Sequence, residues 1–470
     1  MQVFWHRRDL RLHDNRGLAA AADAASGDDG VVSVFVFDDD VLQYASDRRV
    51  AFMRDALAEL RAAYRERGSD LLVRRGDPSG VLPDVAHEYD ADAVHWNADY
   101  SGLAQERDEV VADALSAEGV ATHQYHDAVL HEPGAIRTNA GDPYKVYTYF
   151  WKKWRDREKD DPAEPPAGDA LTAVSGDPLP DSADLGFEDP DIDLPEAGHD
   201  AAVARFADFC EDDVFRYAEA REYPAMDATS HAAQDFHFGT LGVREAYEMT
   251  AAAMHEADGE DERESVREFQ SQLAWREFYT QVLYFNPEVV TTNYSDYENA
   301  IPWRNDAEEI RAWKRGETGY PIVDAGMRQL RAEGYVHNRV RMVVASFLTK
   351  DLLTDWRVGY RHFREYLVDH DTANDNGGWQ WAASTGTDAQ PYFRVFNPQT
   401  QGEKYDPDAE YVREYVPELR DVPADVIHEW PSLDTAERDE HAPDYPDPIV
   451  DHGERREAAI AAFEAARGDD

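Results

Sequence analysis

The sequence predicts an α/β N-terminal domain, built on a five-stranded, parallel, doubly wound sheet, followed by an all-α C-terminal domain. Two patterns predict this fold class. Over roughly the first 130 residues, short apolar runs rich in Val and aromatics alternate with amphipathic stretches, which is typical of strand–helix–strand crossovers. Beyond about residue 200, apolar residues recur at three- and four-residue spacing, as they do in helices.

The N-terminal pattern predicts five short strands, each expected to be buried: Gln2–His6, Val31–Asp38, Leu71–Arg74, Ala93–Asn97 and Thr122–His126. The stretches between them predict the helices Arg16–Ala25, Arg48–Arg67, Val81–Tyr89 and Leu103–Ala117. No GxGxxG motif follows the first strand, so nucleotide binding by this domain would rest on analogy of fold.

The C-terminal half predicts the helices Val266–Leu283, Glu308–Arg315, Ile322–Arg331 and Arg339–Leu353. Gly377 and Gly378 are expected to open a non-helical stretch. Segments rich in Pro, Gly and acidic residues precede this half and show no period. We therefore expect an N-terminal domain over 1–130, a linker over 131–200, a helical domain over 201–430 and an acidic tail over 431–470.

The charge of the chain is extreme, with 97 Asp and Glu against 47 Lys and Arg and a net charge of -50. Acidic disordered proteins have few aromatics, whereas this chain has 11 Trp, 24 Tyr and 19 Phe, and its acids are spread throughout. We therefore expect a folded protein whose surface is adapted to high salt, as in a halophile, because molar salt screens the self-repulsion.

Cysteine content and hydropathy limit the cellular setting. The single cysteine, Cys210, excludes an internal disulfide and a cysteine-based zinc site. The N-terminus lacks the apolar region of a signal peptide, and no apolar stretch reaches the roughly 18 residues of a membrane span. We expect a soluble, cytoplasmic protein that acts as a monomer.

Positive charge and tryptophan gather in the C-terminal half. Residues 311–364 carry 11 Lys and Arg against five Asp and Glu, a local charge of +6, which phosphate binding would require. The alternative is that these cations pair with acids on the same helices. Six tryptophans lie in the same region: Trp275, Trp303, Trp313, Trp356, Trp379 and Trp381.

Carboxylates stand beside these aromatic residues. Asp369 and Asp371 precede Trp379, and near arginines they suit a planar polar ligand such as a flavin. They could also form a metal cluster with His370, but no HExxH motif accompanies them, and we expect no metal. No GxSxG, P-loop or kinase motif is present.

Four long motifs of the chain resemble the DNA photolyase and cryptochrome superfamily. They are RRDLRLHDN (Arg7–Asn15), TGYPIVDAGMRQL (Thr318–Leu330), HNRVRMVVASFLTKDLLTDWR (His337–Arg357) and NGGWQWAASTGTDAQPYFRVFNPQTQGEKYD (Asn376–Asp406). The first resembles the start of the antenna-binding domain, and the others resemble the flavin domain of class I cyclobutane pyrimidine dimer photolyases. The resemblance covers residues 1 to about 430, and it implies light-driven repair of ultraviolet-damaged DNA.

The resemblance implies that the C-terminal domain binds FAD. By motif position, the phosphates would be held by Tyr217, Thr229 and Ser230 in a loop that continues through His231, Ala232 and Ala233. The flavin would be lined by Arg276, Asn338, Arg341, Asp369, His370, Asp371 and Asp375. Trp379, Trp356 and Trp303 match the family's electron-transfer relay, with Trp379 nearest the flavin and Trp303 at the surface.

The resemblance also implies a DNA site into which the damaged pair is flipped, since photolyases are among the base-flipping enzymes. Trp275 and Trp381 would pack on the flipped dimer, with Met342 as an apolar contact and Gln272 touching the bases. Asn338 and Arg339 would lie beside the dimer, and Arg221, Arg394 and Gln401 would hold phosphate or the opposing strand.

Three positions depart from the photolyase pattern. The phosphate loop reads TSHAAQ where TSRLS is common, so Ala233 lacks a hydroxyl and His231 replaces a permanent cation. Gln272 stands where a glutamate is usual, which removes a charge-assisted hydrogen bond. Asp375 stands where photolyases have asparagine and plant cryptochromes aspartate, and a carboxyl there can donate a proton to the flavin.

Repair remains the favoured function, and a cryptochrome-like blue-light receptor or a flavoprotein electron carrier without a DNA role are the alternatives. The second chromophore is also open. Folate-binding members carry an Asn-Glu pair where this chain has Leu103 and Ala104, so we expect a deazaflavin antenna rather than folate.

Overall fold

The computed structural model describes residues 1–25 and 29–468 and divides them into two compact units. Unit 1 comprises residues 1–217 and 229–287, and unit 2 comprises residues 218–228 and 288–470. Residues 469 and 470 of the predicted tail lie outside the described residues. None of the described helices is both long and apolar enough to span a membrane.

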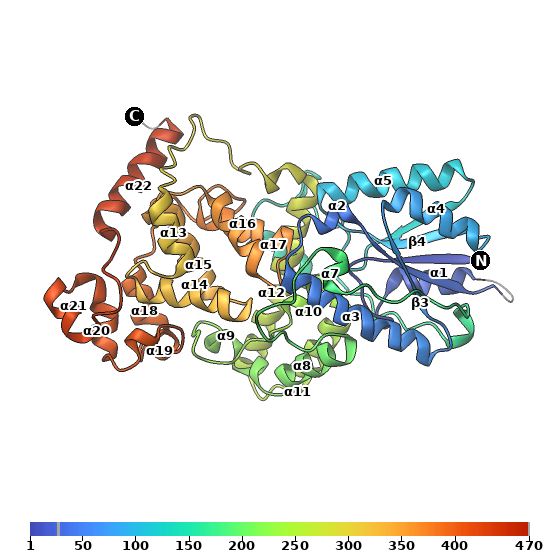
Figure 1. The fold of residues 1–470 in the computed structure, drawn as a ribbon, viewed down its shortest axis with the longest axis horizontal. Coiled ribbons are helices and arrows are strands. Elements are labelled where there is room, and N and C mark those ends of the chain that lie inside the picture. The colour runs from blue at the N-terminus through green and yellow to red at the C-terminus, as the bar shows by residue number, and fades with distance from the viewer. Residues whose placement is uncertain (26–28, 469–470) are drawn as a thin grey trace. The chain divides into compact units, whose positions relative to one another are not determined.

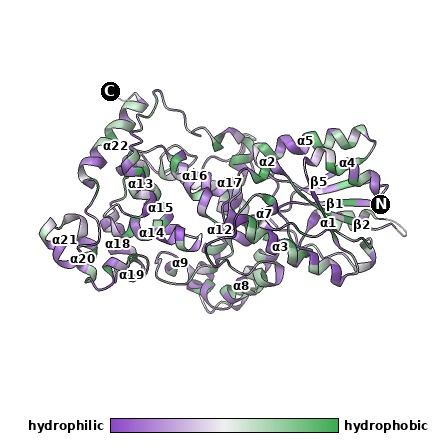
Figure 2. Ribbon diagram, in the orientation of Figure 1, coloured by the Kyte–Doolittle hydropathy of each residue, from purple (hydrophilic) through white to green (hydrophobic). Residues whose placement is uncertain are grey.

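Unit 1 contains a parallel sheet with strand order β3-β2-β1-β4-β5. The strands are β1 (Gln2–His6), β2 (Val31–Phe37), β3 (Leu71–Arg75), β4 (Ala93–Asn97) and β5 (Ala121–Tyr125). Strands β1 to β4, above all the fully buried β2, consist mostly of hydrophobic residues (Figure 2). The predicted five-stranded parallel sheet is therefore confirmed, each strand to within one residue at either end.

Helices cover both faces of this sheet. Helices α1 (Arg16–Ala24) and α3 (Asp47–Glu66) lie on one face, and α4 (Pro78–Glu88) and α5 (Gly102–Ala117) lie on the other (Figure 1). Asn15 caps α1 by accepting a hydrogen bond from Leu18 N, and Asp77 caps α4 in the same way. The short helix α2 (Asp39–Leu42) follows β2.

One expectation for the sheet is wrong. The sequence predicts that β5 is buried like the other strands, but most of its side chains are exposed or half-buried. It is an edge strand, paired on one side with β4 alone. An edge strand needs fewer apolar residues because solvent reaches it, and the sequence ATHQY has few.

The rest of unit 1 is helical. Its helices are α6 (Tyr147–Asp156), α7 (Ser182–Leu185), α8 (His199–Glu211), α10 (Ala233–Phe238), α11 (Val243–Glu256) and α12 (Glu260–Phe285), and α9 (Tyr217–Ala220) spans the boundary of the units. An aromatic-rich core joins α6, α8, α11 and α12. Within the segment expected as a linker, Thr172 N donates to Val31 O, so this stretch runs along the sheet.

A buried ion network ties the start of the chain to α11. Arg244 Nε lies 2.5 Å from Asp14 Oδ1, and its Nη2 lies the same distance from Asp127 Oδ1. Arg11 Nη2 lies 2.7 Å from Asp127 Oδ2. Because these four side chains are almost fully buried and form ion pairs with one another, removing one would leave an uncompensated buried charge. The motif RRDLRLHDN thus has a structural role.

Unit 2 is helical. Its helices are α13 (Ala307–Arg315), α14 (Pro321–Glu333), α15 (Asn338–Ser346), α16 (Trp356–Tyr366), α17 (Thr372–Ala382), α18 (Pro398–Tyr405), α19 (Glu410–Tyr415), α20 (Ala424–Glu429), α21 (Thr435–His441) and α22 (His452–Arg467). Helices α14 and α15 lie side by side (Figure 1). The helix expected to run to Leu353 leaves α geometry after Ser346, and Phe347–Asp351 form a π-helical turn.

Helix α17 corrects a further expectation, because it continues through Gly377 and Gly378. Two glycines weaken an isolated helix by about 2 kcal/mol relative to alanines. Tertiary contacts offset this effect. Asp371 caps the first turn, and the buried amides of Asn376 and Gln380 both donate to Val289 O, at 2.9 and 2.8 Å.

Candidate functional site

The predicted site residues fall in both units, and each group is described by itself. Unit 1 contains Tyr217, Thr229, Ser230, His231, Ala232, Ala233, Gln272, Trp275 and Arg276. Unit 2 contains Arg221, Trp303, Asn338, Arg339, Arg341, Met342, Trp356, Asp369, His370, Asp371, Asp375, Trp379, Trp381, Arg394 and Gln401.

In unit 1, an aromatic stack positions Trp275 on helix α12. Its ring lies parallel to that of Tyr147 in α6, with centroids 3.6 Å apart and an angle of 11° between the planes. The Tyr147 hydroxyl donates to Ser271 O at 2.6 Å, which fixes the stack to the same helix. Sequence reasoning missed Tyr147, although the aromatic run VYTYFWKKW marks this segment.

Gln272 lies three residues before Trp275 and therefore on the same face of α12. Its amide nitrogen donates to Glu268 Oε1 at 3.0 Å and to Ser271 Oγ at 2.9 Å. A carboxylate thus remains within one helical turn, although glutamine replaces the usual glutamate at position 272.

Arg276 connects three segments of unit 1. Its guanidinium donates to Ala128 O at 2.6 Å and to Phe236 O at 3.3 Å, which joins α12 to α10 and to the chain after the sheet. The loop before α10 contains Thr229 to Ala232. There His231 adopts a left-handed conformation with φ of 45°, and its carbonyl accepts from the Gln234 amide at 2.5 Å. Tyr217 packs edge-on against Phe209 and Phe269.

In unit 2, Arg341 organises a cluster of charged side chains between α15 and α17. Its Nη2 lies 2.7 Å from Asp369 Oδ2, and its Nη1 lies 3.5 Å from Asp375 Oδ1. His370 Nδ1 lies 2.6 Å from the other oxygen of Asp375. Arg341 Nε donates to Val336 O at 2.7 Å, which fixes the guanidinium.

The pKa values of this cluster reflect burial and pairing. Burial raises the pKa of Asp369, although Arg341 lowers it. Burial alone lowers the pKa of Arg341, but Asp369 and Asp375 outweigh that effect and raise it. Arg341 is therefore charged throughout the physiological range, and it faces two carboxyl groups.

The cluster fits a ligand that donates hydrogen bonds. Asp369 Oδ1 is buried and has no hydrogen-bond partner among the described residues. A buried acceptor of this kind is costly unless a donor reaches it. The ring N–H and ribityl hydroxyls of FAD are such donors, so these residues fit the cofactor. Asp371 has a different role, because its Oδ1 caps α17 by accepting a hydrogen bond from Asn374 N at 2.9 Å.

The structure does not support the metal alternative at this cluster. Within residues 1–25 and 29–468, Asp369, His370 and Asp371 do not bring three ligand atoms together. His370 is instead paired with Asp375.

Trp356 and Trp379 are both placed by helix α16. Trp379 is 4% exposed, and its ring lies so close to Gly359 that a Cβ there would stand 2.1 Å from its Cη2. Trp356 begins the same helix, and its indole nitrogen donates to Asn293 Oδ1 at 2.9 Å. Tyr360, which sequence reasoning missed, lies edge-on to Trp356 and to His370, at centroid distances of 6.1 and 5.5 Å.

Trp303 is half-buried in the same unit. Its ring packs edge-on against Phe463 at 5.8 Å, and the next residue donates its N–H to Leu353 O at 2.7 Å. Leu353 lies three residues before Trp356. The segment that carries Trp303 therefore contacts the segment that leads to Trp356.

The predicted DNA-facing residues of unit 2 are held by acidic and aromatic neighbours. Arg339 pairs with Glu222 and lies 4.2 Å over the ring of Tyr405. Trp381 is half-buried beside Phe396. Arg394 is exposed, as is its neighbour Phe393, which sequence reasoning missed and whose side chain is 58% exposed.

The local excess of positive charge is partly neutralised in the fold. Of the eleven cations in residues 311–364, several pair with carboxylates in other elements, including Arg328 with Glu418 and Arg339 with Glu222. Lys350 is buried, and burial lowers its pKa to about 7. The net charge of the segment therefore overstates its positive surface.

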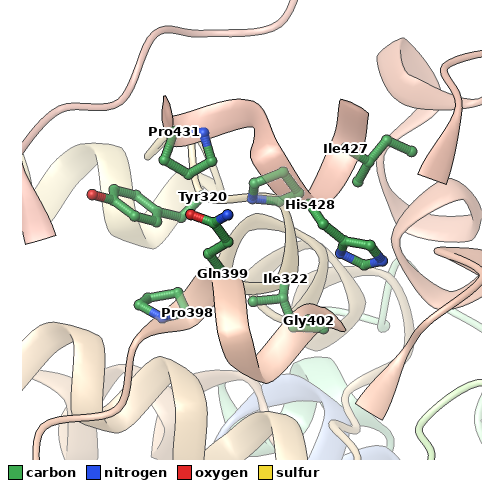
Figure 3. A pocket seen from close by; sticks show the side chains of 9 residues that line it. Tyr320, Ile322, Pro398, Gln399, Gly402, Ile427, His428 and Pro431 are labelled. Atoms are coloured by element: carbon green, nitrogen blue, oxygen red, sulfur yellow. The ribbon is translucent and has the colours of Figure 1, made fainter. Parts of the chain in front are cut away.

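Unit 2 also contains a pocket formed by other residues. It is lined by residues of α14, α18 and α20, among them Ile322, Gly402 and His428 (Figure 3). None of the predicted site residues lines it. This pocket is therefore not part of the predicted flavin site.

Comparison with known proteins decides the family. A family model described as DNA photolyase matches residues 2–167, and one described as the FAD binding domain of DNA photolyase matches residues 269–465. The deoxyribodipyrimidine photo-lyase of Halobacterium salinarum is 63% identical over the whole length of both chains. The chain belongs to the DNA photolyase family. This confirms the predicted family, its FAD-binding domain and the likeness to a halophile.

Solved structures agree with this assignment. A bacterial class III photolyase from Agrobacterium tumefaciens superimposes with a TM-score of 0.91 at 35% identity, covering 99% of this chain and 98% of the other. An archaeal photolyase from Sulfolobus tokodaii with two FAD molecules gives 0.83 at 34%, covering 99% of both chains. A Synechocystis cryptochrome gives 0.88 at 26% identity, covering 98% and 99%. The predicted fold class is confirmed.

Proposed function

We propose that this enzyme is a deoxyribodipyrimidine photo-lyase, which splits cyclobutane pyrimidine dimers in DNA by light-driven electron transfer from reduced FAD. The observation that carries the proposal is the 63% identity, over the full length of both chains, with an enzyme of that name. The charged cluster around Arg341 and the neighbouring tryptophans support it, because they give the cofactor a binding site and a route for electrons.

FAD, when bound, supplies the photochemistry of electron donation. Arg341, Asp369, His370 and Asp375 would hold the flavin, with Asp369 Oδ1 accepting a hydrogen bond that the described residues leave unmade. Asn338, Asp371 and Arg276 would complete its surroundings, and Tyr217 with the loop Thr229–Ala233 would bind the phosphates. The charge of the Arg341 guanidinium favours electron density on a ring beside it.

Trp379, Trp356 and Trp303 would return the cofactor to its reduced form after oxidation. Electrons cross a dry interior efficiently in short steps between easily oxidised rings. Trp379 and Trp356 are both almost fully buried, whereas Trp303 is half-buried and can meet an external reductant.

Trp275 would form one wall of the pocket for the flipped dimer. Because Tyr147 already holds the indole parallel to its own ring, little side-chain freedom would be lost when a base stacks on the other face. Gln272, Asn338, Arg339, Met342 and Trp381 would contact the dimer, and Arg221, Arg394 and Gln401 the DNA backbone or the opposing strand. Exposed Phe393 extends the surface presented by Arg394.

A cryptochrome-like receptor is the second candidate, since Asp375 is the residue found in plant cryptochromes and one similar structure is a cryptochrome. Replacing Asp375 by Asn separates the two functions. If the enzyme repairs DNA, Asp375→Asn should keep its repair rate with chemically reduced cofactor. A receptor should lose a light-induced flavin signal in this variant and should show no repair in either form.

A second chromophore would bind at the carboxyl ends of the strands in unit 1, where ligands of such sheets bind. Exposed apolar side chains follow two of these strand ends, namely Val41 in α2 and Tyr44 just beyond it after β2, and Leu103 in the first turn of α5 after β4. Arg107 is close by, and burial lowers its pKa. These groups suit a planar anion, either a deazaflavin or a second flavin. Extraction of the purified protein followed by absorption spectroscopy distinguishes them, and a released folate would contradict both.

The direct test is a repair assay. Protein with fully reduced FAD is mixed with ultraviolet-irradiated oligothymidylate and illuminated with blue light, and intact thymine pairs are counted against a dark control. Trp379→Phe should block photoreduction and leave repair by chemically reduced enzyme unchanged. Absence of repair in the illuminated wild type would reject the proposal. We further propose that the enzyme acts in the cytoplasm and that it is a monomer. Sedimentation in molar salt would test the monomeric state.

A further inference from the structure

Three side chains from distant parts of unit 1 meet, and none of them is among the residues assigned to flavin or DNA. His13 lies in the loop after β1, His199 is the first residue of α8, and Glu245 lies in the first turn of α11. One nitrogen of each histidine and one carboxylate oxygen all lie within 4.8 Å of one another. Glu245 Oε1 is 3.2 Å from His13 Nδ1 and 3.8 Å from His199 Nε2.

The three ligand atoms of this cluster lie close to one another, and two atoms of the cluster lack a hydrogen-bond partner. His13 Nδ1 and Glu245 Oε2 are both buried atoms without a hydrogen-bond partner among the described residues. His199 Nδ1 lies 3.0 Å from Thr240 O, so this nitrogen carries the proton and leaves the lone pair of Nε2 directed toward Glu245. Metal-binding histidines commonly show this arrangement, with the far nitrogen bound to a carbonyl or carboxylate.

The surrounding structure fixes two of the three ligands. His13 is flanked by Arg11 and Asp14, which belong to the buried ion network with Arg244. Glu245 follows Arg244 in the chain, and its N–H donates to Asp14 Oδ2 at 3.3 Å. The network therefore holds His13 and Glu245 in register before any ligand binds, which reduces the entropy lost on binding.

We propose that His13, His199 and Glu245 form a binding site for a zinc-like divalent cation, with the fourth position open to water. Two imidazoles and one carboxylate suit Zn²⁺, Co²⁺ or Ni²⁺, whereas Mg²⁺ and Ca²⁺ prefer oxygen ligands alone. Tetrahedral ligands at about 2.1 Å from zinc stand about 3.4 Å apart. The distance of 3.2 Å already fits, and a pair at the widest separation of 4.8 Å must approach by about 1.4 Å.

Charge favours a cation at this position. With neutral imidazoles, the three ligands carry one negative charge, and Asp14 and Glu164 are the further carboxylates that act on His13. Arg11 is the cation that acts on Glu245, and its guanidinium is already paired with Asp127. A bound metal would join the loop after β1 to α8 and α11, and thereby stabilise unit 1 independently of repair.

The test uses the holoenzyme with oxidised FAD, stripped of metal and kept in molar KCl with excess Mg²⁺, which occupies the acidic surface. Co²⁺ alone is added, and its visible bands are recorded at wavelengths beyond the flavin absorption. Zn²⁺ affinity is then measured by competition with a chromogenic chelator. We expect one Co²⁺ per chain, displaced by Zn²⁺, and a rise in Tm on adding Zn²⁺.

Ligand variants make the result specific. His199→Gln and Glu245→Gln keep hydrogen-bonding side chains and should each weaken Zn²⁺ binding by about tenfold or more, as loss of a ligand requires. The matched control is His255→Gln, which removes an exposed histidine from the same helix α11 and should bind like wild type.

Equal affinity in all four proteins would overturn the proposal, and so would the absence of any binding above the Mg²⁺ background. A cluster that is no more than an ion pair between His13 and Glu245 would give the latter result, with Tm insensitive to Zn²⁺. Circular dichroism of each variant in metal-free buffer establishes that it folds.

Discussion

Gly359 provides a direct test of how the buried tryptophans are packed. A Cβ added there would stand 2.1 Å from Cη2 and 2.3 Å from Cζ3 of Trp379, and 2.7 Å from a methyl group of Leu348. Carbon atoms in contact are separated by about 3.5 to 4.0 Å, so the indole must move by roughly 1.4 Å or more. Trp379 is 4% exposed and packs against Phe363 and Trp313, so there is little room for that movement.

The expected change in the free energy of unfolding follows from two opposing effects. Alanine favours a helix over glycine by about 1 kcal/mol, whereas forcing extra volume into a packed core costs about 1–3 kcal/mol. We therefore expect Gly359→Ala to lower the free energy of unfolding by up to about 2 kcal/mol. Because the ring that is displaced belongs to the proposed relay, photoreduction of FAD should slow, while repair by chemically reduced enzyme should be little changed.

Gly378 provides a matched control position. Gly378 is a second helical glycine, in α17, and a Cβ there would meet nothing within 4 Å. Gly378→Ala should therefore stabilise the protein by up to about 1 kcal/mol and leave photoreduction unchanged. Chemical denaturation gives the stability, and flavin absorbance under blue light gives the photoreduction rate. Identical results for the two variants would refute the packing argument.

Four further outcomes are expected. Tyr147→Ala should weaken binding of damaged DNA about fivefold, because it removes a ring stack worth roughly 1 kcal/mol. Tyr149→Ala changes an exposed residue of the same helix and should leave the affinity unchanged. An equal loss of affinity in both variants would contradict the stacking role. Burial raises the pKa of Glu277 to about 7, so the wild type should lose stability as pH rises from about 4.5 to 7. Glu277→Gln should abolish that loss, up to about 3 kcal/mol, in denaturation at pH 5 and pH 8. The pH dependence of stability caused by Lys350 has the opposite sign. Because burial lowers the pKa of Lys350 to about 7, stability should rise from pH 7 toward 10.5 by up to about 1.4 kcal/mol per pH unit. Lys350→Met should remove that slope, and an unchanged slope would contradict the assignment. Finally, with a net charge of -50, affinity for DNA should depend weakly or inversely on salt, and a steep loss from low to molar salt would refute this.

Local sequence patterns were sufficient to predict the strands, the family and the acidic surface of this protein. The sequence located all five strands to within one residue at either end, and for β1 to β4 the reason is that parallel strands buried on both faces must be largely apolar. The long motifs around His337 and Trp379 are sufficient to identify the family, because they are contiguous in the chain and do not depend on how it folds. The excess of acidic residues indicated a halophile-like surface, because that property depends on composition and not on contacts.

The tertiary structure decided what no local pattern contains. It placed Arg339 on Glu222, which lies 117 residues earlier, and it stacked Trp275 on Tyr147. It kept α17 helical through two glycines by anchoring Asn376 and Gln380 to a carbonyl of another segment. It also brought His13, His199 and Glu245 together. The physical reason is common to all of these, since residues far apart in the chain become neighbours only when whole helices and strands pack. Periodicity therefore predicts each helix and strand, and packing determines which side chains from different elements contact one another.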